Sequence, residues 1–469
     1  MIWPMILAAG TAVAVLLVDL VFPRWYAPFG VGLLGSLATA VSAYVVPGGQ
    51  LRLLCAEADR CSYVLDDTAR LVAALIAVLT AFALLLYAPG LRAGEAPAGE
   101  VGFLLASAMT GGVVLGGARD LITLIVALET LTLPLYALVA LHRRREGASA
   151  AVTFFTTSIV ATAISLLGAA LLQLSSGFVH LPVAMRHDIE GGQPLAIAGL
   201  VLLLTGFGFK VAAVPLHAWA PTTYDGAPLP VAAYLSTASK LGGVIAILYV
   251  ADATAGTDLR VTAGGSLAVL ATLSLVIGTL VALRQDRTVR LLAWSSVAQA
   301  GFILAPLGGL LMSSDSVLFS AALAYTLFFL ALEFGAFAGV LALRPHPGQD
   351  GGVLEDLRGL GRAAPWRSAM LAFALIGLAG LPPVLAGLFA KITVIRALLD
   401  QNSLWLALLV ALISVVGLAV YWRPLAAMYR GSVDERPAAS FWPLLPLAVA
   451  TVATVVLSFA PQLTMSLWE

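Results

Sequence analysis

The sequence predicts an all-α, polytopic membrane protein of about 14 transmembrane helices. Hydrophobic residues make up 61% of the 469-residue chain and charged residues only 11%, whereas soluble domains are usually about 25% charged. Apolar runs of about 20 residues, the length that crosses a bilayer as a helix, recur along the whole chain. These observations exclude a water-soluble enzyme and a nucleic-acid-binding protein.

Each predicted helix is one apolar run bounded by polar joints. In chain order, the runs cover residues 3–22, 26–46, 69–89, 99–118, 120–141, 149–174, 194–216, 228–251, 264–283, 288–310, 316–343, 365–399, 404–428 and 441–465. Helices are the only spanning elements that satisfy every backbone hydrogen bond without closing a barrel. The runs therefore predict helices rather than strands.

The arginines indicate the orientation of these helices. Fifteen lie in the joints after odd-numbered helices and six in the joints after even-numbered ones. Basic residues stay preferentially on the cytoplasmic side, so both termini are predicted to lie outside. The joint between the second and third helices then lies on the oxidising side, where Cys55 and Cys61 either form a disulfide or remain two free thiols.

Two of the runs are interrupted. Residues 365–399 would form a straight helix about 52 Å long, and they contain Gly380-Leu381-Pro382-Pro383, which predicts a break because proline removes a backbone donor. Residues 194–216 carry a milder interruption at Gly206, Gly208 and Pro215. Broken helices at matching positions are typical of inverted-repeat transporters, and an odd offset of five helices requires inversion.

The predicted organisation follows from these two breaks in helices 7 and 12. Residues 1–98 hold helices 1–3, residues 99–252 the first inverted repeat of helices 4–8, residues 253–430 the second repeat of helices 9–13, and residues 431–469 the C-terminal helix 14.

The lysines mark the candidate site. Of the 25 basic residues only three are lysines, and Lys210, Lys240 and Lys391 all fall inside apolar runs, as does Glu129. A charge at the centre of a membrane costs ~2.5–3.5 kcal/mol, so four such groups indicate function. A desolvated lysine can release its proton near neutral pH, whereas arginine stays charged. Glu129 and Lys210 are therefore predicted to form a proton switch, with a static ion pair that fixes helix packing as the alternative.

Three further residues are candidate relay groups. His217 could load protons or simply cap a helix end. Gln299, with Ser295 and Ser296 on the same helix, could hold water between the lysines, and Glu333 could pass protons as a buried carboxylate. The sequence contains no dinucleotide, phosphate-loop or metal-ligand motif, so any redox chemistry is expected in partner subunits.

Several ordered motifs carry a family resemblance. They comprise residues 128–129, 133–140, 209–221, 224–228, 236–240, 290–299, 355–360, 378–383 and 389–391. Together they resemble the antiporter-like proton-channel subunits of respiratory complex I, NADH:quinone oxidoreductase. Lysine at 391, where another subunit type of this family would have glutamate, favours one type within it.

The resemblance implies a role for each residue. Glu129 and Lys210 would form the switching pair, Lys240 the central relay, and Lys391 the exit-side residue. The chain would be a non-redox, proton-translocating subunit in the bacterial cytoplasmic (inner) membrane. Its partners would be the other membrane subunits, with FMN, iron–sulfur clusters and quinone bound elsewhere in the complex.

Two other functions stay open at this point. A multi-subunit cation/proton antiporter or a membrane-bound hydrogenase would share the fold and the lysines. A scaffold that does not conduct protons is suggested by two departures from the family pattern: Gln299 stands where histidine is common, and Thr153 lies near a position where lysine is common.

Overall fold

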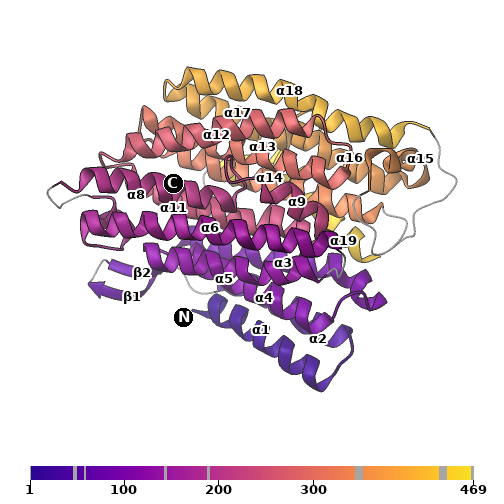
Figure 1. Cartoon of the computed structure of the whole chain (residues 1–469). Helices are drawn as coiled ribbons and strands as arrows, with labels where there is room; N and C mark the ends of the chain where they lie inside the picture. The colour runs from indigo at the N-terminus through magenta and orange to yellow at the C-terminus, as the bar shows by residue number, and fades with distance from the viewer. Residues whose placement is uncertain are drawn as a thin grey trace.

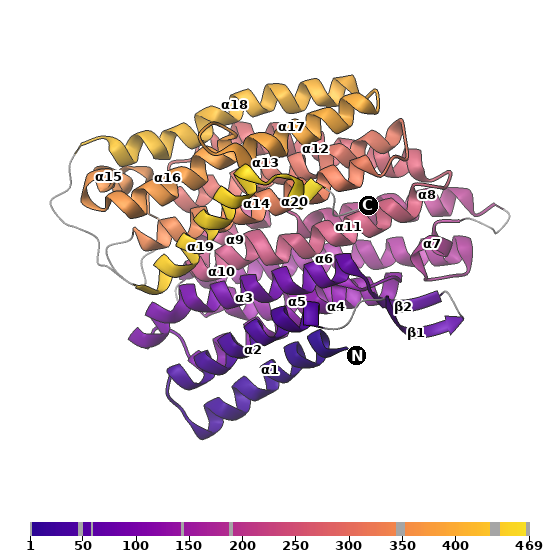
Figure 2. The same cartoon turned by 180° about the vertical axis from the view of Figure 1, so that it is seen from behind.

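The computed structural model describes residues 2–45, 50–57, 60–141, 145–186, 191–343, 352–431 and 441–465. Its long helices lie side by side in one bundle, with their axes running in roughly the same direction (Figures 1 and 2). Four arginines of the orientation argument, Arg143, Arg144, Arg344 and Arg436, lie outside the described residues.

The helices follow the predicted runs closely. They are α1 (Trp3–Val21), α2 (Tyr26–Val45), α3 (Asp67–Ala93), α4 (Ala98–Gly116), α5 (Leu121–Ala140), α6 (Arg145–Ser176), α7 (Leu181–Ala184), α8 (Gln193–Lys210), α9 (Trp219–Gly226), α10 (Leu229–Tyr234), α11 (Lys240–Thr254), α12 (Arg260–Ala282), α13 (Thr288–Gly308), α14 (Val317–Ala342), α15 (Leu360–Ala363), α16 (Pro365–Ala379), α17 (Leu385–Asp400), α18 (Leu404–Tyr429), α19 (Phe441–Phe459) and α20 (Gln462–Met465). Within the described ranges, 13 helices are long and apolar enough to cross a membrane, and α16 with α17 supplies the remaining predicted crossing. The prediction of an all-α membrane protein is confirmed.

The break in helix 12 is confirmed at the predicted residues. Helix α16 ends at Ala379, and α17 begins at Leu385. Gly380 adopts the left-handed conformation, with φ of 78°, which glycine reaches at no steric cost. The two prolines that follow cannot continue the helix, so the sequence places this break without ambiguity.

The break in helix 7 is confirmed at Pro215, but the two glycines predicted to interrupt the helix lie before it. The run 194–216 ends as a helix at Lys210, and a second half, α9, begins at Trp219 in a segment predicted to be a loop. Gly206 stays helical because it packs against α6, where a methyl group would lie 2.1 Å from Ser165 Oγ. The backbone instead turns at Ala212, whose φ is 59°.

Helix 8 contains an irregularity that the sequence did not predict. Helices α10 and α11 form one buried span, but a π-helical turn over Leu235–Ser239 joins them. Such a turn inserts an extra residue into the helical repeat and is frequent at functional sites. Lys240 is the first residue after it.

A β-hairpin, also missed at the sequence level, joins α2 and α3. Strands β1 (Leu51–Glu57) and β2 (Arg60–Leu65) pair antiparallel, and Cys55 and Cys61 are disulfide-bonded across them. Along β2, buried residues alternate with less buried ones with a period of two, as expected of a strand with one covered face. The structure thus decides in favour of the disulfide.

Neighbour relations recur between the two predicted repeats. In the first, α4 packs against α5, and α6 against α8; in the second, α12 packs against α13, and α14 against both α16 and α17. The division into two inverted five-helix repeats stays a prediction. In Figure 2, α1 begins beside the hairpin, whereas α15 lies at the opposite end of the bundle.

The halves of helix 12 meet at a pair of glycines, which generates a stability prediction. A methyl group at Gly387 would lie 1.7 Å from the Gly377 carbonyl oxygen. Gly387→Ala should therefore force the halves apart and destabilise the protein by about 1–3 kcal/mol, the usual cost of overpacking. The measurement is the thermal unfolding midpoint in purified membranes. Gly10→Ala is the matched control, because a methyl group at Gly10 would have no contact atom within 4 Å. Equal midpoints for the two variants would contradict the prediction.

Candidate functional site

Three helices converge on the side chain of Lys210. Its Nζ donates to Glu129 Oε1 of α5 at 2.8 Å and to Thr132 Oγ1 at 3.0 Å. A longer contact of 3.4 Å reaches Ser158 Oγ on α6. The Lys210 side chain is buried, with 6% exposed, so the ion pair largely replaces its lost hydration.

The position of Lys210 also suits its charge. As the last residue of α8 it lies where the helix dipole favours a cation. A backbone carbonyl at the end of this helix finds a donor in the other half of the break, because Trp219 Nε1 donates to Phe209 O at 3.1 Å. Glu129 is less enclosed, with 22% of its side chain exposed, and its Oε1 also accepts from Thr162 at 2.7 Å.

The helix that begins at Lys240 contacts Lys210 one turn further along. Gly243, three residues after Lys240 on α11, faces Lys210 so closely that a methyl group there would lie 2.8 Å from Lys210 Cβ. Lys240 itself is 1% exposed, and its Nζ donates to Ser296 O at 2.6 Å and to Ser296 Oγ at 2.5 Å. Its partner is thus a neutral residue on α13, and no carboxylate bonds to it among the described residues.

Glu333 supplies a carboxylate near Lys240 without bonding to it. The side chain is fully buried on α14, and neither carboxylate oxygen has a hydrogen-bond partner in the described part of the chain. It lies within electrostatic reach of Lys240, Tyr224 and Tyr421. An ionised carboxylate is costly in an apolar interior unless a partner compensates its charge.

Lys391 is held by the break in helix 12. Its Nζ donates to Ala379 O, the last carbonyl of α16, at 2.6 Å. Gly380 leaves room for it, since a methyl group there would lie 3.2 Å from Lys391 Nζ. The ammonium also lies 5.3 Å from the centre of the Phe302 ring, within cation–π range.

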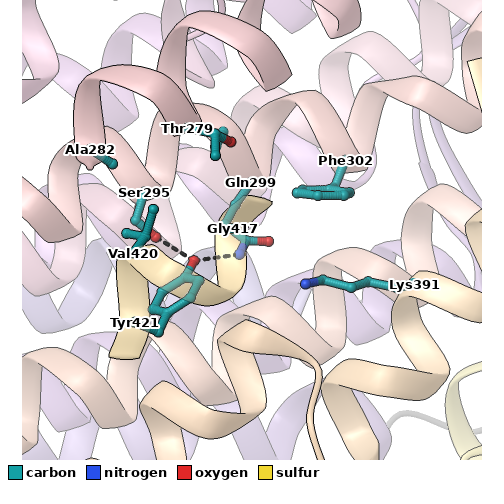
Figure 3. Close-up of a pocket in the computed structure, with 10 residues that line it drawn as sticks. Thr279, Ala282, Ser295, Gln299, Phe302, Lys391, Gly417, Val420 and Tyr421 are labelled. Atoms are coloured by element: carbon teal, nitrogen blue, oxygen red, sulfur yellow. Dashed lines mark hydrogen bonds between the residues drawn. The ribbon is translucent and has the colours of Figure 1, made fainter. Parts of the chain in front are cut away.

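Polar side chains of α13 and α18 face Lys391 across a small cavity (Figure 3). Gln299 Nε2 donates to the Tyr421 hydroxyl at 2.7 Å, and Ser295 Oγ lies 2.5 Å from the same hydroxyl. On its other side, Gln299 Oε1 accepts from the Tyr325 hydroxyl at 2.5 Å. Both ends of the Gln299 amide are therefore fixed.

His217 is not brought to the lysines. It was predicted at the end of a helix, but it lies in the segment that connects the two halves of helix 7. Its Nδ1 lies 3.2 Å from the carbonyl oxygen of Pro215, and its ring packs against Trp294. Thr153 is likewise engaged locally, because its hydroxyl donates to Ser149 O.

Hydroxyl groups that were not predicted from the sequence complete the site. Thr132, Ser158 and Thr162 surround the Glu129–Lys210 pair, and Tyr421 joins Ser295 to Gln299. Some signal existed: Thr132 follows Glu129 by three residues, a spacing that shares one helix face. No such signal marked Tyr421, because the residues to which it bonds belong to a segment far away in the sequence.

Among the described residues, no three histidine, cysteine, aspartate or glutamate side chains come together as a metal site. The ionisable groups of the interior are instead spread along the bundle on α5, α8, α11, α14 and α17.

Comparisons with known proteins place this arrangement in a family. A family model described as "NADH:quinone oxidoreductase/Mrp antiporter, TM" matches residues 118–417. NADH-quinone oxidoreductase subunit N of Salinispora tropica is 52% identical, over 99% of this chain and 97% of that protein. Subunit N 2 of Streptomyces griseus is 39% identical, over 98% and 91%.

Solved structures give the same result. A chain of respiratory complex I from Thermus thermophilus is similar with a TM-score of 0.82 and 28% identity, over 98% of both chains. A chain of the Mrp complex from Dietzia has a TM-score of 0.82 at 20% identity, over 100% of this chain and 96% of that one, and shows the shared fold alone. The expected subunit type is confirmed by the similarity to subunit N. The chain therefore belongs to the family of antiporter-like membrane subunits of NADH:quinone oxidoreductase and the Mrp antiporters, and it resembles the oxidoreductase's subunit N.

Proposed function

We propose that the chain is a proton-translocating membrane subunit of a bacterial NADH:quinone oxidoreductase. The observation that carries the proposal is the placement of its three lysines, each buried and each at a helix end, a π-helical turn or beside a helix break. Protons would move outward when electron transfer in partner subunits shifts the Glu129–Lys210 pair. FMN, iron–sulfur clusters and quinone would all be bound by those partners.

The Glu129–Lys210 contact provides the switch. While the carboxylate lies 2.8 Å from Nζ, it stabilises the ammonium form. Separation of the two would leave a buried cation without its counter-ion, and the lysine would then give up its proton. The break after Lys210 ends the helix there, which gives the backbone freedom to move, and Thr132 and Ser158 offer neutral acceptors in the separated state.

Lys240 would receive the proton next. It lies one turn from the Gly243 contact with Lys210, and Ser296 holds its Nζ with two neutral oxygen atoms. Glu333 lies nearby as a carboxylate that can be neutral or ionised. We assign Glu333 the role of a second switchable partner, which favours the ammonium form of Lys240 when it is ionised.

Lys391 would be the exit-side residue of the relay. Its Nζ bonds to the carbonyl of Ala379 alone among the described residues, so a small movement of either half of helix 12 would change its proton affinity. On the predicted orientation both termini lie outside the cytoplasmic membrane, and release from Lys391 would deliver protons to that side. His217, away from the three lysines, would act at most in proton entry.

The alternative function, a subunit of a cation/proton antiporter or a membrane-bound hydrogenase, is disfavoured by the comparisons. The Mrp complex chain and the membrane-bound sulfane sulfur reductase chain are 20% and 22% identical, which shows the fold alone. The 52% identity to an oxidoreductase subunit covers almost the whole chain. The scaffold alternative makes a different prediction, since removal of the lysines would then change assembly rather than proton transport.

The lysines generate the first functional prediction. Lys210→Ala, Lys240→Ala and Lys391→Ala enzymes should assemble yet show a lower ratio of protons moved to electrons transferred, because each variant interrupts the relay. The measurement is proton transport and quinone reduction recorded together in vesicles. Arg396→Ala is the matched control, since this exposed cation on α17 pairs only with Asp400 in the described chain. A full ratio in all three lysine variants would refute the proposal.

Glu333 generates the second functional prediction. Glu333→Gln keeps the shape of the side chain but cannot ionise, so it removes an interaction worth about 1–2 kcal/mol in a partly screened interior. Coupled NADH:quinone turnover should fall by about tenfold. Glu355→Gln, at an exposed carboxylate that pairs with Arg358, should retain normal turnover. Equal rates for the two variants would show that Glu333 takes no part.

A further inference from the structure

The relay described above lacks a proton carrier between Lys240 and Lys391. Lys240 bonds to Ser296 on α13, whereas Lys391 bonds to Ala379 in the broken helix 12. Gln299 lies between them on α13 but cannot ionise, and both ends of its amide are fixed by tyrosine hydroxyls. A proton must therefore pass through another group.

The Tyr421 hydroxyl occupies this gap. Tyr421 reaches in from α18, is 5% exposed, and contacts Ser295 Oγ at 2.5 Å as well as Gln299 Nε2 at 2.7 Å. Ser295 directly precedes Ser296, the residue that holds Lys240. Glu333 also lies within electrostatic reach of Tyr421, so one hydroxyl borders the surroundings of Lys240 and faces Lys391.

A small cavity separates Tyr421 from Lys391 (Figure 3). It is lined by Ser295, Gln299, Tyr421 and Lys391, and the Lys391 side chain points into it. Its volume of about 10 Å³ is about the room that one water molecule needs. The polar lining groups can supply the two to four hydrogen bonds that hold such a water in place.

We propose that the Tyr421 hydroxyl, together with one water in this cavity, carries protons between the Ser295–Ser296 side and Lys391. In each transfer the Lys240 ammonium is the source of the proton and becomes a neutral amine. Ser295 gives its hydroxyl proton to the phenolic oxygen and is reprotonated from the Lys240 side, while the phenol's own proton leaves to the water. The water in turn passes a proton to the neutral amine of Lys391. One O–H or N–H bond forms for each that breaks, and rotation of the hydroxyl restores the start. The inference rests on the proposed function, because it assumes that Lys391 belongs to the relay.

A positioning role for Tyr421 makes a different prediction. If Tyr421 only orients Gln299, then loss of the other hydrogen bond to the same amide, from Tyr325, should have the same effect. If the hydroxyl of Tyr421 carries the proton, its loss should be the more severe, because Tyr325 does not line the cavity. Tyr→Phe substitution removes one oxygen atom in either case and preserves the packing.

The experiment compares Tyr421→Phe, Tyr325→Phe and Lys391→Ala in the assembled enzyme. Proton transport and quinone reduction are recorded together in vesicles, and subunit content is checked by co-purification. Tyr87→Phe is the control for loss of a buried hydroxyl, since Tyr87 lies on α3 and its hydroxyl has no hydrogen-bond partner among the described residues. The expected result is a proton-to-electron ratio in Tyr421→Phe as low as in Lys391→Ala, with a smaller loss in Tyr325→Phe and none in Tyr87→Phe.

Each other outcome overturns a distinct claim. A full ratio in Tyr421→Phe, with a low ratio in Lys391→Ala, would refute the role of Tyr421 and leave the proposed function standing. Equal losses in Tyr421→Phe and Tyr325→Phe would assign Tyr421 to the orientation of Gln299. A full ratio in Lys391→Ala would remove Lys391 from the relay, and this inference with it.

Discussion

A buried cation must have a partner, and this requirement governs the interior of the bundle. In the apolar medium a lysine without compensation costs several kilocalories per mole, far more than at a protein surface. Each lysine meets the requirement differently: Lys210 by the carboxylate of Glu129, Lys240 by the oxygens of Ser296, and Lys391 by the carbonyl of Ala379. Each of these partners belongs to another helix or helix segment, so the contact depends on how the helices pack.

The interruption in helix 12 provides the partner of Lys391 at a low energetic cost. An unbroken helix uses its interior carbonyls for its own backbone, whereas the end of α16 leaves the Ala379 carbonyl free to accept from Lys391. Glycines then let the charged side chains approach. Gly243 faces Lys210, and Gly380 faces Lys391, at distances that would not admit a methyl group without movement. At Lys391 the helix break and Gly380 thus act together: the break supplies a neutral acceptor, and the glycine leaves room for the side chain.

The sequence predicted the ends of most elements well but misjudged those that depend on tertiary packing. The break at Gly380 and the two prolines was predictable because proline acts locally. Gly206 and Gly208 misled the prediction for helix 7, since Gly206 serves close contact with α6 rather than a break. The hairpin over Leu51–Leu65 was hidden because the helix prediction rested on long apolar runs, and strands of six or seven residues fall below that length.

By itself, the sequence singled out the residues proposed to carry the chemistry: three lysines and Glu129 inside apolar runs are improbable without a function, whatever the fold. It also determined the family, because the motifs are contiguous. Only the tertiary structure decided which groups meet. Glu129 and Lys210 lie 81 residues apart and Ser295 and Tyr421 lie 126 apart, yet each pair is within hydrogen-bonding distance. Helix periodicity fixes the face on which a side chain lies but not the helix that it faces, so the pairing depends on how the bundle packs.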